Sequence, residues 1–486
     1  MTPMGTGHRL TALDASFLHL EKAGAHMHVA GITILDGPAP EYDDLMAHVE
    51  SRLHLVPRYR QRLAEVPFEQ GRPVWVDDPH FNLRYHLRHT GLPAPGSEDQ
   101  LKALAGRLFA QRLDRAKPLW ELWLVDGLQD GRFSVITKTH HALVDGIAGV
   151  DIATVLFDTA RDPVPVGPPD RRWTPSPLPS RAQLLSDALL ERATSPAEVV
   201  RGVRHLVRRP RQVLDRARDA LAGMGALTFA GLSPAPPTCL NVPIGPHRRY
   251  TWVDADLSQF KAIKTALDGT VNDVVLTVVT GALGRFLRHR GAATDGLELK
   301  AMVPVSVRAD AEQGVLGNRV AAMWAPLPVG VEDPVEQFAA VRAAMGDLKS
   351  SGQAVGAQAL TDIAGFAPPT IMSQAARLQA RQRFFNLVVT NVPGPQVPLY
   401  VLGRRMRALY PVVPLARNQA LGIAVMSYDG TLGFGLLADY DALADLDVFA
   451  VALEDSIDAL AIAAGVMQRA RHRRRAAPGR LSPSPA

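Results

Sequence analysis

The sequence predicts an α/β protein of two domains, each built around a mixed sheet. Three observations lead to this class. The chain has 486 residues, 47% of them hydrophobic, which is enough for two to three domains with sizeable cores. Strand-like and helix-like patterns alternate over residues 1–160 and again over 240–465. A stretch rich in proline and arginine separates these two regions.

The first region, 1–160, contains strands and helices in alternation. Segment 26–35 is rich in β-branched residues and is predicted as a strand, and segment 41–53 has the apolar spacing of a helix. The segments ELWLVDGL and RFSVITKTHH, joined by QDG, are typical of a hairpin. The apolar segment 147–160 is predicted as a buried helix. This mixture favours an N-terminal domain with a mixed sheet.

The linker, 161–238, differs in composition from both regions. Its first part, RDPVPVGPPDRRWTPSPLPS, has too much proline for regular structure. Helices are predicted over 181–193, 196–209 and 211–222, and the second begins with SPAE, a serine cap followed by proline. The arginines that make the linker basic are Arg201, Arg204, Arg208, Arg209, Arg211, Arg216 and Arg218.

The second domain is predicted to span residues 239–468. It contains a helix over 272–291, for which Asn272 is the expected N-cap and Gly291 the stop. A second helix at about 446–465 ends the fold, and the basic tail 469–486 is predicted to be disordered. Strands are predicted over 299–307, 385–394, 420–430 and 431–439, the last two forming a hairpin around YDG.

Charge and cysteine content limit the function classes. The net charge of +5 is too small to indicate nucleic-acid binding and fits an anionic cofactor or membrane surface equally well. Cys239 is the only cysteine, which excludes an intrachain disulfide and a multi-cysteine metal site and favours a reducing, cytoplasmic compartment. The N-terminal segment lacks the pattern of a signal peptide, and no run of about 18 apolar residues predicts a membrane span.

The segment KTHHALVDG places two adjacent histidines at the end of a predicted strand. Because strand side chains alternate, His141 should share a face with Val135, Thr137 and Thr139, while His140 points to the other face. One histidine is therefore expected to do chemistry as a neutral, proton-accepting imidazole, and the other to support it. Gly146 permits a sharp entry into the next helix, and Asp145 can cap that helix or pair with an arginine.

Other interpretations of the histidine pair stay open at this point. Such a pair at a strand end is often structural. A zinc site is weakly indicated, because the HExxH spacing is absent and no cysteine assists. A Ser-His-Asp triad lacks its G-x-S-x-G turn, and Cys239 lies in a Pro-rich segment that is a poor setting for a nucleophile. No bound metal is expected.

The string HHxxxDG resembles the active-site motif of the CoA-dependent acyltransferase superfamily. Within that superfamily the chain is similar to the bacterial wax ester synthase/acyl-CoA:diacylglycerol acyltransferase family over about residues 10–465. One departure is Leu421-Gly422, where the family often has Leu-Asn, which affects acceptor choice. The further matching segments, in order, are LTALDASFLHLE, KPLWELWLVDGL, LNVPIGPHRRY, TVNDVVLTVVTGAL, VPVSVR with GNRV, VVTNVPGP and SYDGTLGFGLLADYD.

The resemblance implies two chloramphenicol-acetyltransferase-like α/β domains with a tunnel between them. It implies that His141 is the general base, that His140 supports it, and that Asp145 holds the loop through an arginine. The candidate arginines are Arg58, Arg60, Arg62 and Arg308. Asn272 and Asp273 match the family's second motif, in which helix capping is an alternative role. Pro118, Leu119 and Trp120 match its Pro-Leu-Trp signature, for which packing is the favoured role.

The implied reaction is transfer of a long-chain acyl group from acyl-CoA, a co-substrate, to diacylglycerol or a fatty alcohol. The basic segments then suggest peripheral attachment to an anionic membrane or lipid droplet, without nucleic-acid binding. Two alternatives stay open: acylation of another hydroxyl or amine, such as a polyketide or glycolipid, and a non-catalytic lipid-body coat protein. The intact HHxxxDG motif argues against a coat protein.

Overall fold

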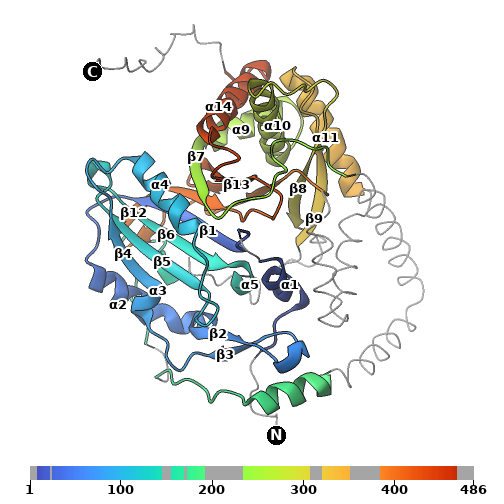
Figure 1. Ribbon diagram of the computed structural model, residues 1–486. Coiled ribbons are helices and arrows are strands. Elements are labelled where there is room, and N and C mark those ends of the chain that lie inside the picture. Colours follow the sequence, from blue (N-terminus) through green and yellow to red (C-terminus); the bar gives the residue numbers. More distant parts are fainter. Residues whose placement is uncertain are drawn as a thin grey trace, which may run out of the picture.

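A computed structural model describes residues 8–21, 24–144, 155–168, 172–191, 234–306, 320–350 and 384–467. They form two domains, each with a six-stranded sheet (Figure 1). The elements of the first domain, up to residue 144, are α1 (Ala12–Leu20), β1 (His28–Leu35), α2 (Tyr42–Arg52), β2 (Gln61–Ala64), β3 (Val74–Asp77), α3 (Leu83–His86), β4 (Leu87–Gly91), α4 (Glu98–Phe109), β5 (Trp120–Asp126), β6 (Phe133–His140) and α5 (His141–Val144).

The second half of the chain supplies the remaining helices and strands. They are β7 (Arg248–Asp256), α9 (Leu257–Ala266), α10 (Val271–His289), β8 (Leu299–Ser306), β9 (Val320–Leu327), α11 (Pro334–Ser350), β10 (Leu387–Val392), β11 (Tyr400–Val401), β12 (Arg404–Val412), β13 (Leu421–Tyr428), β14 (Thr431–Asp439) and α14 (Leu446–Ala463).

The first sheet has the strand order β11-β12-β1-β6-β5-β4 and is mixed. β1 pairs antiparallel with both β6 and β12, whereas β4 pairs parallel with β5. The register places His28 opposite His140, at the end of the sheet where β6 runs into α5. Two of the six strands, β11 and β12, therefore reach the first sheet from the second half of the chain.

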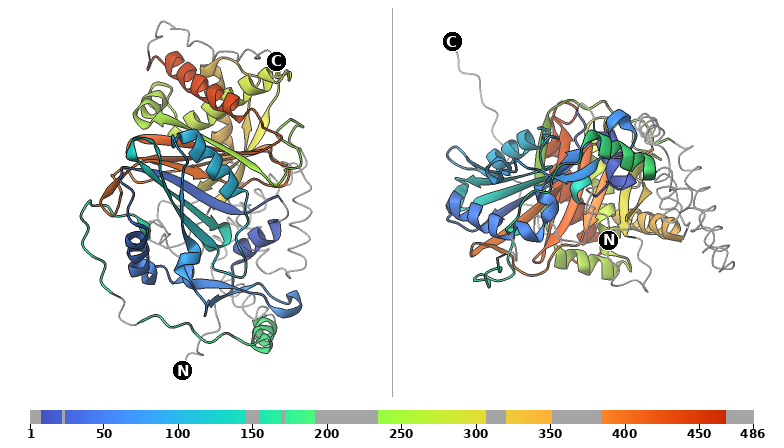
Figure 2. Two further views of the ribbon diagram at one scale, coloured as in Figure 1. Left: turned by 60° about the vertical axis from the view of Figure 1, so that its left-hand side comes forward. Right: turned by 90° about the horizontal axis from the view of Figure 1, so that it is seen from below.

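The second sheet has the order β7-β14-β13-β10-β8-β9. β10 pairs parallel with both of its neighbours, and the other pairs are antiparallel. Helices α9, α10, α11 and α14 cover the side of this sheet that faces away from the first domain (Figures 1 and 2). Most of α10 is buried, because its continuous apolar sequence packs between α14, α11 and the sheet.

The two sheets meet along β12 and β14. A Cβ atom built on Gly433 or Gly435 would overlap the backbone oxygen of Leu409 or of Pro411, so both positions require glycine for this close approach. A shared apolar cluster continues the contact, in which the Trp252 and Tyr410 rings stack at 4.5 Å. The domains are thus joined by a packed interface as well as by the chain.

Most predicted elements are confirmed, including the 120–140 hairpin and the hairpin around YDG. The predicted N-cap of the 272–291 helix is wrong: Thr270 caps α10, and Asn272 lies inside its first turn. The helix predicted to continue to residue 160 ends at Leu156 in the described part. The first linker helix is described over 181–191. Segments 196–209, 211–222 and 469–486 lie outside the described residues.

Within the described residues, no single helix has the length and hydropathy of a membrane span. In the part of the chain that the structure describes, α9 and α10 taken together reach that composition, but they are bent by 98° relative to each other.

Candidate active site

The two histidines lie where β6 ends and α5 begins, on the side of the first domain that faces the second (Figure 1). His140 is the last residue of the strand, and its N–H donates to the Leu119 carbonyl at 2.9 Å. The expectation that His141 lies on the strand is wrong: it begins the helical turn α5, and its N–H donates to the Met27 carbonyl at 2.8 Å. The change of backbone direction, rather than strand alternation, separates the two rings.

His141 is half-buried, and its ring stacks on Phe17 of α1. The two ring centroids are 3.9 Å apart and the planes differ by 22°. A flat aromatic neighbour covers the face of the imidazole and restricts its rotation. Helix α1 is thus part of the site, although sequence reasoning assigned it no role.

His140 is buried, with 1% of the residue exposed. Its Nδ1 accepts a hydrogen bond of 3.1 Å from the Ala142 N–H. Because Nδ1 accepts, Nε2 carries a ring proton. That nitrogen faces the Glu21 carboxylate, with 3.8 Å between Nε2 and Oε2. His140 therefore ties the first turn of α5 to the end of α1.

Glu21 follows the last turn of α1, and its side chain is 1% exposed. Arg115 donates from Nε to its Oε2 at 2.8 Å, and Arg112 lies 3.4 Å from the same oxygen. Burial alone would raise the pKa of Glu21, but the polar contacts with His140 and His28 and the charge of Arg115 together hold that pKa well below its ordinary value. Glu21 is thus a buried, ionised group beside the histidine pair.

Two further histidines lie near His140: His28 is the first residue of β1, and His26 precedes that strand. Burial lowers the pKa of His28, to about 4, and also that of His26, to about 4, so both rings are neutral at pH 7. The His28 ring meets His140 edge-on at 5.9 Å and lies 3.6 Å from Glu21 Oε1. These two rings add packing and polarity around His140 without adding charge.

Pro118, Leu119 and Trp120 are buried beneath the end of β6. Trp120 donates from Nε1 to the Tyr59 carbonyl at 2.8 Å and stacks on His86 at 4.7 Å. Since the Leu119 carbonyl also accepts a hydrogen bond from the His140 N–H, this segment fixes the backbone position of His140 at the end of β6. The contacts support a packing role for the Pro-Leu-Trp segment.

Asn272 and Asp273 lie in the second domain, at the start of α10. Asp273 is buried and completes a capping box with Thr270, whose N–H donates to Asp273 Oδ2 at 2.8 Å. Asn272 accepts through Oδ1 from Asn391 of β10 at 3.3 Å. The contacts of this motif are therefore made within the second domain, where they join α10 to the sheet.

Asp145, Gly146 and Arg308 lie outside the described residues. The other three candidate arginines have partners of their own. Arg58 lies over the Trp75 ring, Arg60 lies over the Trp173 ring, and Arg62 approaches Asp78 at 3.9 Å.

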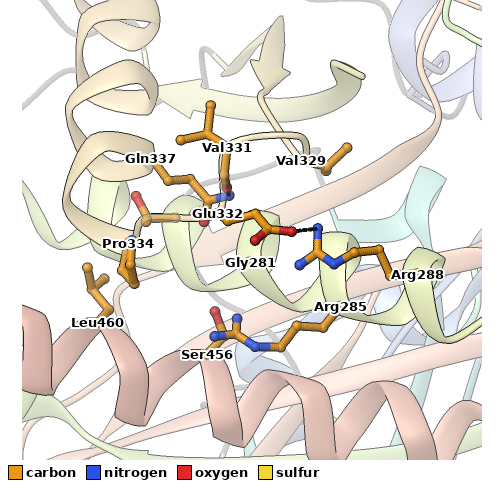
Figure 3. A pocket seen from close by; sticks show the side chains of 11 residues that line it. Gly281, Arg285, Arg288, Val329, Val331, Glu332, Pro334, Gln337, Ser456 and Leu460 are labelled. Carbon is orange, nitrogen blue, oxygen red and sulfur yellow. Dashed lines mark hydrogen bonds and ion pairs between the residues drawn. The ribbon is translucent and has the colours of Figure 1, made fainter. Parts of the chain in front are cut away.

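Two of the hollows that the described residues form are not lined by either histidine. One, of about 160 Å³, lies between α10, α11 and α14, where Arg288 pairs with Glu332 at 3.4 Å (Figure 3). The other is an open surface cleft of about 530 Å³ on the first domain, lined in part by Arg112 and Arg115. Among the described residues, no group of His, Cys, Asp and Glu side chains is arranged to share a metal ion.

Comparison with known proteins identifies the family of this chain. The family model for the wax ester synthase/diacylglycerol acyltransferase catalytic domain matches residues 10–275, and the model for the C-terminal domain of the same family matches 316–461. A probable diacylglycerol O-acyltransferase of Mycobacterium tuberculosis is 35% identical over 459 residues, which are 92% of this chain and 94% of that one. A second protein of that name and organism is 34% identical and covers 93% and 98%.

Solved structures give the same result. The wax ester synthase/diacylglycerol acyltransferase of Marinobacter aquaeolei VT8 superposes with a TM-score of 0.64 at 28% identity, covering 94% of this chain and all of that one. The first condensation domain of the CDA synthetase shares the fold, with a TM-score of 0.55 at 16% identity and coverage of 95% and 96%. The family models and the relatives make this two-domain protein an acyltransferase. The chain belongs to the wax ester synthase/diacylglycerol acyltransferase family.

Proposed function

We propose that the protein transfers a long-chain acyl group from acyl-CoA to the hydroxyl of diacylglycerol, of a long-chain alcohol, or of both. The observation that carries this proposal is the half-buried His141, which stacks on Phe17 beside a buried His140. The chain is also similar, over more than nine-tenths of their length, to proteins named as probable diacylglycerol O-acyltransferases. The solved relative from Marinobacter aquaeolei VT8 supports an alcohol as a second acceptor.

The proposed reaction proceeds without a covalent acyl-enzyme. His141 takes the proton of the acceptor hydroxyl, and the resulting alkoxide oxygen attacks the thioester carbonyl. The tetrahedral oxyanion collapses, the C–S bond breaks, and the CoA sulfur leaves with the proton that the imidazolium returns. His140 supports the base, and Asp145 with Gly146 shapes the loop that follows. We place the meeting of the two substrates between the domains, because α5 lies on the side facing the second domain.

We also propose that the protein associates peripherally with an anionic membrane or a lipid droplet in the cytoplasm. The acceptors and products are insoluble in water, and the basic segments within 201–218 and 469–475 are suited to an anionic surface.

Purified protein with palmitoyl-CoA, offered hexadecanol and dioleoylglycerol in competition, tests the reaction. The expected result is release of free CoA together with hexadecyl hexadecanoate, palmitoyl-dioleoylglycerol, or both, resolved by chromatography. If neither ester forms, and CoA is released no faster than in a reaction without any acceptor, the proposal is contradicted.

A further inference from the structure

Helix α1 contacts both histidines, and it does so through two different side chains. Phe17 stacks on His141, and Glu21, four residues later, faces His140. Side chains four residues apart lie on the same side of a helix, so one helix end reaches both rings. Arg115 fixes that end, since it donates to the Leu18 carbonyl at 2.8 Å as well as to Glu21.

A row of polar groups leads from Arg115 to the backbone of α5, with a gap of 3.8 Å between Glu21 Oε2 and His140 Nε2. Arg115 donates to Glu21, Glu21 faces Nε2 of His140, and Nδ1 of His140 accepts from the Ala142 N–H. Ala142 directly follows His141. The row therefore ends on the peptide unit that determines where the His141 side chain begins.

The order of these groups fixes the tautomer of His140. An anionic acceptor on the Nε2 side attracts the ring proton to Nε2, which leaves Nδ1 as the acceptor that the Ala142 N–H requires. If the proton moved to Nδ1, that nitrogen would face the Ala142 N–H with a second donor, and the turn would lose a buried hydrogen bond. Glu21 excludes this arrangement without touching His141.

We propose that Glu21 is a positioning residue for acyl transfer, which acts through His140 to hold the turn that presents His141. This inference rests on the proposed function only in that turnover is the readout. Glu21 does not contact the reacting groups, so it is not a catalytic residue. Its loss should lower kcat and leave the KM for acyl-CoA nearly unchanged.

Glu121, in strand β5 of the sheet that carries His140, offers a matched control. It is also a buried carboxylate with two basic partners, since Lys138 Nζ lies 3.0 Å and Arg88 Nη2 lies 3.1 Å from its oxygens. These partners are not histidines, and Lys138 donates onward to the carbonyls of Leu108 and Gln111. Glu121→Gln therefore removes a comparable buried charge without breaking the row to Ala142.

A double-mutant cycle between Glu21 and His140 distinguishes positioning from general stabilisation. The variants are Glu21→Met, His140→Asn and the double variant, because an asparagine oxygen can replace Nδ1 as the acceptor for the Ala142 N–H. We expect Glu21→Met to lower kcat roughly 10- to 100-fold, by analogy with residues that orient metal ligands through hydrogen bonds. In the His140→Asn background the same change should lower kcat by less than about threefold, because the effects of mutations at two coupled residues are not additive.

The isosteric Glu21→Gln keeps a hydrogen-bond acceptor, and we expect this variant to retain more activity than Glu21→Met. If Glu21→Met does not fold, Glu21→Gln takes its place in the double-mutant cycle. Glu121→Gln should lower the melting temperature without lowering kcat. Equal losses of kcat for the Glu21 change in both backgrounds, or wild-type kcat for folded Glu21→Met, would overturn the inference. Wild-type protein that acylates neither acceptor would instead overturn the proposed function.

Discussion

Phe17 restricts rotation of the His141 ring, because the two rings stack with their centroids 3.9 Å apart. The general base that we propose at His141 must meet the acceptor hydroxyl at hydrogen-bond distance, and a fixed imidazole plane favours that geometry. Three independent elements converge on the two histidines: α1 through Phe17, the 118–120 segment through the Leu119 carbonyl, and the chain before β1 through the Met27 carbonyl.

His141→Ala should abolish nearly all turnover while the fold remains intact. General-base catalysis contributes roughly 10²- to 10⁴-fold, so kcat should fall by that factor. His140→Ala should lose less, because it displaces the base rather than removing it. The measurement is the rate of ester formation together with the melting temperature, and His247→Ala, at an exposed histidine of the second domain, is the control. A His141→Ala protein that melts normally and turns over at the wild-type rate would disprove the mechanism.

Much of the histidine site follows from the sequence, and part of it does not. HHxxxDG identifies the pair because the motif is local. Glu21 and Arg115 lie 119 and 25 residues from His140, and no local pattern relates them. The one available signal is that the matching segment LTALDASFLHLE ends in a carboxylate shortly before HMH. The helical start at His141 was missed because a strand pattern was continued one residue too far.

At the scale of elements, strands and helices were predicted well where an apolar run is uninterrupted. Strand 431–439 matches β14 at both ends, and helix 446–465 matches α14 within two residues. β12 was not predicted, because Arg404, Arg405, Arg407 and Pro411 interrupt its apolar pattern. Only its place between β1 and β11 makes it a strand.

Unfolding measurements on variants at the N-terminus of α10 can distinguish helix capping from a role in the reaction for Asn272 and Asp273. Asp273→Ala removes the carboxylate that accepts from Thr270 and should lower the free energy of unfolding by about 0.5–2 kcal/mol, the usual cost of a lost cap. Asn272→Ala loses one longer bond to Asn391 and should cost less. Urea unfolding measures both.

Ser97→Ala, in the capping box of α4 in the first domain, provides the matched control. It should destabilise to a similar extent as Asp273→Ala. Activity that vanishes in Asp273→Ala while the unfolding free energy stays unchanged would assign Asp273 a role in the reaction itself.

At the scale of the whole molecule, buried neutral histidines make stability depend on pH. Burial lowers the pKa of His86 to about 4, and the same cause brings His26 and His28 to about 4. The unfolded chain binds these protons near pH 6.5, whereas the folded protein binds them only near pH 4. Their contribution is therefore complete above pH 6.5 and is lost as the pH falls towards 4.

His86→Phe should flatten this acid dependence. Each such histidine gives a slope of about 1.4 kcal/mol per pH unit between its two pKa values, so the variant should lose about one such slope between pH 4.5 and 6. Its absolute stability should also fall, because His86 bonds to the Trp120 carbonyl at 2.8 Å. Urea unfolding at several pH values gives the slopes, and an unchanged slope would mean that His86 is already protonated in the folded protein.

The proposed attachment to membranes is also a property of the whole molecule. Each basic residue near an anionic surface contributes about 1 kcal/mol, and salt screens this attraction. Deleting residues 469–486, which contain Arg469, Arg471, Arg473, Arg474 and Arg475, should reduce sedimentation with anionic vesicles at low salt. Turnover on an acceptor dispersed in detergent should not change. Equal sedimentation of both proteins across the salt series would remove the tail from the binding surface.

The position of β12 has a consequence for how the protein is made. β1 lies near the N-terminus, yet the strand on its outer side, Arg404–Val412, is among the last to leave the ribosome. Until then β1 presents an unpaired edge, which can pair with other chains. The first domain should therefore fold after synthesis is nearly complete. It should also fold slowly, because the pairing of β1 with β12 spans most of the sequence.

A fragment ending at residue 238 should aggregate or melt without a cooperative transition, whereas co-expression with residues 239–486 should recover soluble, active protein. A monomeric fragment with a sharp calorimetric transition would show that this domain can be completed without its late strand.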